Sequence, residues 1–347
     1  MDTPLVIDDT WSASRALRAI ERGSRLLWQG DWHTGKQVVA ALKRRLRPRE
    51  SDFASYRRAR GRQMRVVNSV LVRIDSSYGV EARRAPDVRR ACLLAYGVGR
   101  GDRLVPLQEL LGVIGAEQLR LRGVEVPALG GRIHPHYGVF APTRSEYADL
   151  VARAPLDAVG QAFDVGTGTG VLAAVLAKRG FAVTATDLSP RAVECARENL
   201  TRLGLTADVV RADLFPPGRA DLIVCNPPWI PARPIGLLDH AVYDENSQML
   251  RRFLSGARDH LEPGGQVWLI LSDLAEHLGL RSRDELLKLI ESGGLAVAGR
   301  SEIAPRHTRA QTARTRQGGG GRGGGLLAEA RAREITSLWR LAPAIQH

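Results

Sequence analysis

The run Asn226-Pro227-Pro228-Trp229 combines groups that suit chemistry at a planar nitrogen. The lone pair of an amide or exocyclic amine is delocalised, and acceptors aimed at its N–H bonds help to localise it. The Asn226 side-chain oxygen and the Pro227 carbonyl can be these acceptors, because the prolines restrict the backbone. Trp229 offers a flat face for stacking. Catalysis of this kind needs mainly positioning and hydrogen bonding, without a dedicated side-chain base.

A glycine-rich turn, Asp164-Val165-Gly166-Thr167-Gly168-Thr169-Gly170, follows a short apolar run and precedes a helical pattern. Asp187 comes 17 residues after Gly170, at the end of the next expected strand, where a carboxylate can bind ribose hydroxyls. Asp213-Leu214 ends the third strand, where an adenine edge would lie. Together these residues predict a site for a nucleoside-bearing cofactor, and they leave NAD and S-adenosylmethionine open.

The motif at residues 226–229, taken with this turn and the two acidic positions, resembles the class I S-adenosylmethionine-dependent methyltransferases over roughly residues 131–300 and the closing strand. Asn-Pro-Pro-aromatic is similar to the signature of the branch that methylates planar nitrogens, which includes N6-adenine, N2-guanine and HemK-type protein-glutamine enzymes. The resemblance implies S-adenosylmethionine as cofactor and Asn226, Pro227 and Trp229 as catalytic residues. It implies cofactor contacts from Asp164, Gly166, Thr167, Gly168, Gly170, Asp187, Leu188, Asp213, Leu214 and Asn226.

Two further segments resemble the HemK-type enzymes. The run His134–Glu146 is similar to the segment that closes over the cofactor, which implies that Phe140, Pro142 and Thr143 line the methionine end of the pocket. Val242–Glu245 is similar to the region after the signature. The implied substrate-binding residues are Pro228, Trp229 and Tyr243. Trp229 stands where the family more often has Tyr or Phe, which enlarges the stacking platform.

The elements that must position these residues alternate between strands and helices from about residue 131. Repeated β-α units predict an α/β fold with a largely parallel sheet and helices on both faces. The resemblance makes this a Rossmann-like, seven-stranded class I methyltransferase domain over residues 131–347. Residues 305–325, rich in Arg and Gly, predict a flexible insertion between the last two strands.

The first 130 residues predict a mainly helical (α+β) accessory domain for substrate recognition. Helices are expected over Trp11–Leu27, Gln37–Leu46 and Ala85–Tyr96, with a helix pair over Leu104–Gly123 broken near Gly112 and Gly115. The β-branched run Val66–Ile74 predicts a strand.

The charge is unevenly distributed along the 347 residues. The chain carries 50 Lys and Arg against 37 Asp and Glu, for a net charge of +13. Residues 1–130 contribute 24 basic and 14 acidic side chains, and the rest of the chain is nearly balanced. Since 46 of the basic residues are arginines, a GC-rich genome is one source of this bias, and a polyanionic partner is the other interpretation.

Other features exclude several classes of protein. The chain has no run of about 18 apolar residues and no basic, apolar leader at its start, so we expect neither a membrane span nor a signal peptide. Three separated cysteines favour a reducing, cytoplasmic setting. His134 and His136 lack a clear third ligand, so we expect no metal.

The substrate stays open between two macromolecules. One hypothesis is a nucleobase amine in RNA or DNA, supported by the N-terminal charge. The other is a glutamine side chain in a translation protein, supported by residues 134–146. The alternatives are a small planar metabolite as substrate, or a non-catalytic nucleic-acid-binding module. The sequence does not indicate an oligomeric state.

Overall fold

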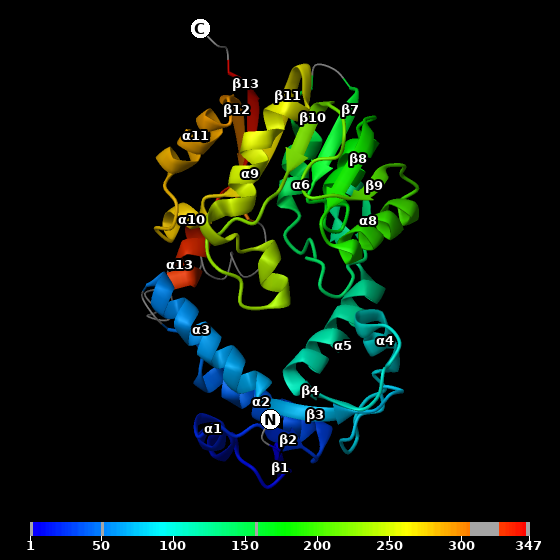
Figure 1. Cartoon of the computed structure of the whole chain (residues 1–347), viewed down its shortest axis with the longest axis vertical. Coiled ribbons are helices and arrows are strands. Elements are labelled where there is room, and N and C mark those ends of the chain that lie inside the picture. Colours follow the sequence, from blue (N-terminus) through cyan, green and yellow to red (C-terminus); the bar gives the residue numbers. More distant parts are fainter. Residues whose placement is uncertain (1–2, 50–51, 157–158, 306–325, 345–347) are drawn as a thin grey trace. The chain divides into compact units, whose positions relative to one another are not determined.

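The computed structural model describes residues 3–49, 52–156, 159–305 and 326–344. The chain divides into two units, Met1–Leu121 and Arg122–His347, each visible in Figure 1. The expected Arg/Gly-rich insertion at residues 305–325 lies outside the described residues, apart from Pro305.

The N-terminal unit contains a four-stranded sheet in the order β1-β2-β3-β4. Strands β1, β2 and β3 are parallel, and β4 runs antiparallel to β3. Its core includes the fully buried side chains of Leu26, Trp28 and Leu71. The strands are β1 (Leu5–Ile7), β2 (Leu26–Trp28), β3 (Val70–Ile74) and β4 (Arg103–Pro106). The helices are α1 (Ala13–Glu21), α2 (Trp32–Arg45), α3 (Phe53–Asn68), α4 (Arg89–Tyr96) and α5 (Leu107–Arg122), whose last residue belongs to the second unit.

Three expectations for this unit are wrong. The helix expected to reach Leu27 ends at Glu21, because Gly23 adopts a left-handed φ of +96° and the following apolar residues form β2. Val66 and Val67 complete α3, so only the second half of the β-branched run is a strand. The expected helix pair is a strand, β4, followed by the single helix α5, which passes through Gly112 and Gly115 without a break.

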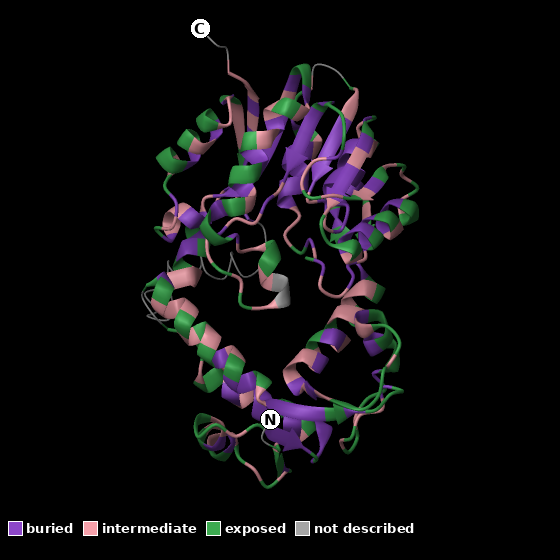
Figure 2. Ribbon diagram, viewed as in Figure 1, coloured by how far each residue is buried: buried purple, intermediate pink, exposed green. Residues whose placement is uncertain are grey.

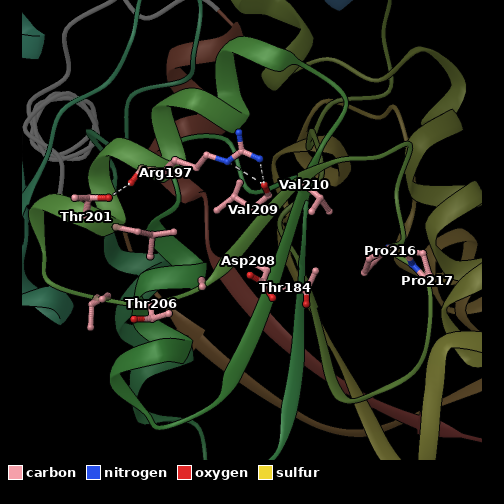
Figure 3. Close-up of a pocket in the computed structure, with 12 residues that line it drawn as sticks. Thr184, Arg197, Thr201, Thr206, Asp208, Val209, Val210, Pro216 and Pro217 are labelled. Carbon is pink, nitrogen blue, oxygen red and sulfur yellow. Dashed lines mark hydrogen bonds between the residues drawn. The ribbon is translucent and has the colours of Figure 1, made fainter.

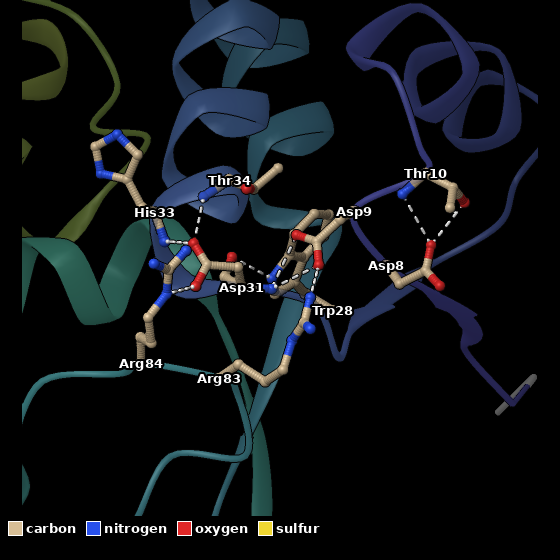
Figure 4. Close-up of polar contacts among 9 residues, drawn as sticks. All are labelled: Asp8, Asp9, Thr10, Trp28, Asp31, His33, Thr34, Arg83 and Arg84. Carbon is tan, nitrogen blue, oxygen red and sulfur yellow. Dashed lines mark hydrogen bonds and ion pairs between the residues drawn. The ribbon is translucent and has the colours of Figure 1, made fainter.

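A polar cluster around Asp31 joins three segments of the N-terminal unit (Figure 4). The Asp31 carboxylate caps α2 by accepting from the backbone N–H groups of His33 and Thr34, at 3.0 and 3.3 Å. It also accepts from Arg84 Nε at 2.6 Å, and this hydrogen bond holds the pKa of Asp31 below its usual value. The Asp31 N–H in turn donates to Asp9 at 2.9 Å. The start of α2 is therefore fixed to residues from both sides of it in the sequence.

The second unit is built on a seven-stranded sheet in the order β12-β13-β11-β10-β7-β8-β9. The neighbours from β11 to β9 are parallel, and β13 is antiparallel to both β11 and β12. This confirms the predicted seven-stranded, mostly parallel α/β fold. The strands are β7 (Gln161–Val165), β8 (Ala182–Asp187), β9 (Asp208–Arg211), β10 (Ala220–Cys225), β11 (Leu261–Ser272), β12 (Leu295–Ile303) and β13 (Thr336–Pro343); β5 (Val124–Val126) and β6 (Gly131–Ile133) form a separate hairpin.

Helices cover both faces of this sheet, whose central strands are buried (Figure 2). Successive residues of β11 alternate between the faces. Trp268 and Ile270 pack in the cluster that includes α6, α7 and α8, whereas Val267 and Leu269 pack in the cluster that includes α9 and α11. The helices are α6 (Glu146–Arg153), α7 (Val171–Lys178), α8 (Pro190–Arg202), α9 (Gln248–Ala257), α10 (Leu274–His277), α11 (Arg283–Ser292) and α13 (Leu326–Arg333). The short helical turns are η1 (Pro127–Leu129), η2 (Leu237–Ala241), η3 (Glu245–Ser247) and η4 (Arg258–His260). Of the described helices, none combines the length and the apolar character that crossing a membrane requires.

Phe253 provides a test of this packing. Its ring is fully buried in α9 and stacks on Phe215, with the ring centroids 5.6 Å apart. Phe253→Ala should lower the free energy of unfolding by about 3–5 kcal/mol, because the lost apolar contacts leave a cavity. Leu287→Ala, on the exposed side of α11, should cost less than about 1 kcal/mol. Urea unfolding of the variants measures both values, and equal losses would contradict the assignment of Phe253 to the core.

Candidate active site

Parallel strands bring the predicted site residues to one edge of the sheet. Gly166, Asp187, Asp213 and Asn226 each lie at or just after the carboxyl end of one of β7, β8, β9 and β10. Because these strands are parallel neighbours, their carboxyl ends share one edge. Ligands of open α/β sheets bind at this edge.

The glycine turn is held against β8 and leaves space beside its backbone. The N–H groups of Gly166 and Thr167 both donate to the Thr186 carbonyl, at 2.9 and 2.8 Å. Gly168 and Gly170 adopt left-handed φ angles of +56° and +83°. A Cβ atom at Gly170 would lie 3.1 Å from Ala196 Cα, whereas one at Gly168 would meet no atom within 4 Å. The turn thus packs closely on α8 at Gly170 and is open at Gly168.

Asp164 fixes the turn to the start of α7 from inside the protein. Its Oδ2 accepts from the Thr167 hydroxyl at 2.6 Å and from the Ala173 N–H at 2.9 Å. Its Oδ1 is buried and has no hydrogen-bond partner among the described residues. Burial raises the pKa of Asp164 to about 7. The Asp164 carboxyl group thus holds the turn in place, although removing it from water costs free energy.

Asp187 presents a carboxylate at the end of β8. It accepts from the N–H groups of Gly168 at 3.0 Å and Ser189 at 2.9 Å, and burial raises its pKa. Leu188 beside it is exposed. An adenosyl group carries two ribose hydroxyls and a flat base. A carboxylate acceptor, open space at Gly168 and an exposed apolar side chain fit these features.

Asp213 and Leu214 lie at the same edge with different surroundings. Asp213 is exposed and pairs with Arg252 at 2.8 Å. Leu214 has a φ of +73°, and its carbonyl accepts from the Thr186 hydroxyl, which ties this loop to β8. Their contacts with a cofactor stay predictions.

The motif at residues 226–229 has an internal hydrogen bond. The Trp229 indole Nε1–H donates to Asn226 Oδ1 at 2.8 Å. A carbonyl oxygen has a second lone pair, so Asn226 retains an acceptor for a substrate. Pro227 is buried, and Asn226, Pro228 and Trp229 are partly exposed.

Tyr243 lies beside this motif through backbone pairing. Ile230, the residue after Trp229, forms a parallel bridge with Tyr243. The Ile230 N–H donates to the Val242 carbonyl at 3.0 Å, and the Asp244 N–H donates to the Ile230 carbonyl at 2.9 Å. The structure therefore brings the predicted substrate-binding residues Pro228, Trp229 and Tyr243 into one region.

The segment at residues 134–146 is fastened to α8. The His134 N–H donates to Asn199 Oδ1 at 2.7 Å, and His136 Nε2 lies 3.0 Å from Glu198 Oε2. Within the described ranges, no three His, Cys, Asp or Glu side chains form a group that could hold a metal ion. Pro142 is buried, whereas Phe140 and Thr143 are exposed, and their contacts with the methionine end of a cofactor stay predictions.

Sequence reasoning missed a buried ion-pair network next to Trp229. Arg144 Nη1 donates to both carboxylate oxygens of Glu334 at 3.0 Å, and its Nε donates to Glu146 at 3.2 Å. The guanidinium lies over the Trp229 ring, 5.4 Å from its centroid. Arg144 and Glu146 stood in a segment already singled out, but no signal in the sequence links them to Glu334, 190 residues away.

A hollow of about 680 Å³ lies away from these residues, along the outer strand β9 (Figure 3). It is lined by parts of β8, α8 and β9, and Thr184, Arg197 and Asp208 are among its residues. None of the predicted site residues lines it. We therefore place the site at the strand ends, where the motifs meet, and not at this hollow.

Comparison with known proteins finds relatives of the part of the chain that carries the motifs. Residues 130–283 match the family model of the methyltransferase small domain. A ribosomal RNA small subunit methyltransferase C from Alcanivorax borkumensis is 35% identical over 113 residues, which are 32% of each chain. A release factor glutamine methyltransferase from Cereibacter sphaeroides is 34% identical over 170 residues, which span 44% of this chain and 59% of the relative. The matched region thus spans 32% of the length of the first relative and 59% of the length of the second, so each relative has parts that this chain does not match.

Among solved structures, the ribosomal protein L11 methylase of Lactobacillus delbrueckii subsp. bulgaricus aligns with 60% of this chain and 82% of its own, at 19% identity and a TM-score of 0.39. The family match agrees with the resemblance drawn from the motifs: residues 130–283, which hold the glycine turn and the motif at 226–229, match the methyltransferase small domain.

The buried carboxyl of Asp164 makes stability depend on pH. Its pKa rises from 3.8 in the unfolded chain to about 7 in the folded protein, so the folded state holds the proton more tightly. The native protein should lose stability relative to an Asp164→Asn variant as pH rises from about 4 to 7, and the difference should level off above pH 7. The expected change is on the order of 4 kcal/mol. Urea unfolding of both proteins across this range measures it; a pH-independent difference would show that Asp164 stays ionised.

Proposed function

We propose that the protein is a cytoplasmic S-adenosylmethionine-dependent N-methyltransferase whose substrate is the exocyclic amine of a nucleobase in RNA. One observation carries the reaction class: the Asn226 carboxamide and the Pro227 backbone follow β10, at the edge of the sheet that also holds the glycine turn and Asp187. A cofactor at the turn and a nitrogen at Asn226 would then share one edge.

The chain's own residues activate and orient the nitrogen. S-adenosylmethionine, when bound, supplies an electrophilic methyl group. Asn226 Oδ1 and the Pro227 carbonyl accept from the two N–H bonds of the amine, which localises the lone pair on nitrogen. Trp229 stacks against the plane of the base and directs that lone pair toward the methyl group. The contribution of the protein is geometry and hydrogen bonding.

The N-terminal unit supports RNA as the substrate. Helices α2 and α3 carry four and five Lys or Arg residues and no acidic residue within their bounds. They pack together, and Gln63 Nε2 on α3 donates to the Lys43 carbonyl on α2 at 2.8 Å. Burial and the charge of Arg60 lower the pKa of Lys43, so basic groups of both helices share one region. Such a concentration of positive charge suits a phosphate backbone.

A glutamine side chain in a translation protein is the second candidate. The match to a release factor glutamine methyltransferase covers more of this chain than the match to the ribosomal RNA enzyme. An amide N–H pair is similar to an exocyclic amine, so Asn226 and Pro227 would act on it in the same way. The basic helices α2 and α3 favour the RNA candidate, because their positive charge can pair with phosphates, which a glutamine side chain lacks.

Labelled methyl transfer separates the two substrates. The protein is incubated with radiolabelled S-adenosylmethionine and a cell extract that was treated beforehand with ribonuclease, deoxyribonuclease or protease. We expect label in material that ribonuclease removes and protease does not. Label lost only on protease treatment would support the glutamine candidate, and label in small molecules would contradict both.

Asn226 should contribute far more to transfer than to cofactor binding, because it is one of several implied cofactor contacts. Asn226→Ala removes an acceptor that acts in the transition state, so we expect transfer to fall by about 10²–10³-fold. Calorimetric binding of S-adenosylhomocysteine should change by less than about three-fold, because the turn and Asp187 remain. Gln118→Ala, which removes an exposed carboxamide from α5, is the control. Full activity of Asn226→Ala would disprove the mechanism.

The arginines on one face of α3 should bind RNA. Arg58, Arg62 and Arg65 are exposed and follow helical spacing, so they form one stripe. Replacing all three with Gln should weaken RNA binding and reduce the slope of log Kd against log salt by about 2, since fewer counterions are released. A control of equal charge change replaces Arg202, Lys288 and Arg331, which are exposed in the other unit. Filter binding measures the RNA affinity of both triple variants. If both lose the same affinity, the stripe on α3 is not the RNA-binding surface.

A further inference from the structure

We propose that Arg144 and Trp229 are positioning residues that hold the Asn226 carboxamide in its working orientation, through a relay that begins at the buried carboxylate of Glu334. The inference rests on the proposed function for its catalytic consequence. Its structural part stands independently, because it concerns contacts within the chain. The relay runs from Glu334 to Arg144, from Arg144 to the Trp229 ring, and from the indole N–H to Asn226.

The last contact of the relay selects one of two carboxamide orientations. An asparagine side chain can rotate by half a turn and exchange its oxygen for its NH₂ group, which cannot accept a hydrogen bond. The indole of Trp229 can only donate. Its hydrogen bond to Asn226 Oδ1, at 2.8 Å, therefore fixes which side of the carboxamide carries the oxygen. A phenylalanine at this position would keep a stacking face, but it has no N–H group to fix the orientation of the Asn226 carboxamide.

The ring of Trp229 is held in turn by Arg144. The guanidinium lies 5.4 Å from the ring centroid, within the range of a cation–π interaction. Two carboxylates fix the guanidinium: the side chain of Glu334 is 0% exposed and that of Glu146 is 5% exposed. Nε and Nη1 are held by different carboxylates, Glu146 and Glu334, so these two contacts together set the plane of the guanidinium.

Glu334 is anchored on the strand next to the one that carries the motif. Its Oε1 accepts from the Ser272 hydroxyl at 2.6 Å, and Ser272 is the last residue of β11. Ile335 beside it donates its N–H to Asp273 Oδ1 at 2.7 Å. Since β11 pairs directly with β10, both ends of the relay are fixed to adjacent strands.

The electrostatics of the relay favour a geometric role over a stabilising one. One guanidinium compensates two buried carboxylates, and its Nη2 is buried without a hydrogen-bond partner among the described residues. Removing these charged groups from water costs free energy, and the attraction between them barely offsets that cost. The ion pairs therefore add little to the free energy of unfolding. What the arrangement does provide is a fixed position for the ring of Trp229.

The same domain contains a comparable arginine–tryptophan contact away from Asn226, at a ring that Arg300 also covers. Arg283 Nε donates to Glu276 at 2.8 Å, and its guanidinium lies 5.3 Å from the centroid of the Trp339 ring. Its side chain is 33% exposed, close to the 24% of Arg144. Arg283→Lys is thus a control for Arg144→Lys, because each keeps the charge and removes the fork.

Indole N–H resonances test the relay without a substrate. The chain has six tryptophans, so the indole region of a ¹⁵N–¹H spectrum holds few peaks, and Trp229→Phe identifies one by its loss. We expect Asn226→Ala and Arg144→Lys each to shift the Trp229 peak. Arg283→Lys should leave it in place. An unmoved Trp229 peak in either site variant would overturn the relay.

Kinetics test its consequence with the substrate fraction found by labelled transfer. Trp229→Phe should lower kcat about ten-fold or more, because the oxygen of Asn226 is no longer oriented. KM and the Kd of S-adenosylhomocysteine should stay within about two-fold, since the stacking face and the turn persist. Arg144→Lys should also lower kcat, whereas Arg283→Lys should leave kcat unchanged.

The two proposals fail in different ways. If no fraction accepts methyl groups, the proposed function fails and the indole spectra still decide the relay. If transfer occurs and Trp229→Phe keeps its full kcat, the positioning role is disproved and the proposed function stands.

Discussion

The constraint on which the site depends is that the central strands of the parallel sheet are covered by helices on both faces. A strand in this position has no solvated face, so its side chains are apolar along most of its length. Asp164 is the buried polar residue of β7, and burial raises its pKa to about 7. Polar chemistry is therefore concentrated where the strands end. The glycine turn, Asp187 and the motif at 226–229 all lie there because the interior of the sheet excludes them.

Much of the second unit was predictable because its signals are local. Short apolar runs that alternate with helical patterns indicated the order of strands and helices, and parallel topology placed their ends together. Glu334 was not predictable, because its partner Arg144 is 190 residues away and pairing over such a distance leaves no periodic trace. The hydrogen bond between Trp229 and Asn226 also needed coordinates, since it depends on side-chain orientation.

The N-terminal unit was harder to predict. Its strands β1 and β2 have three residues each, too few for an alternating pattern, and β2 is buried throughout. A short apolar run reads equally as a helix end or a buried strand. The opposite error occurred at Val66 and Val67, whose β-branched side chains favour a strand but complete α3. Packing against the rest of the unit outweighed local preference there.

Strand β13 determines when the sheet can be completed. It is the last of the described strands along the chain, yet it lies inside the sheet, between β12 and β11. During synthesis β12 has no neighbour in the sheet until β13 emerges and fills the gap. Glu334 lies two residues before the start of β13, so the same late event delivers the carboxylate that meets Arg144. A ribosome-bound chain can thus shape the glycine turn early, while the surroundings of Trp229 are completed only when the sheet closes.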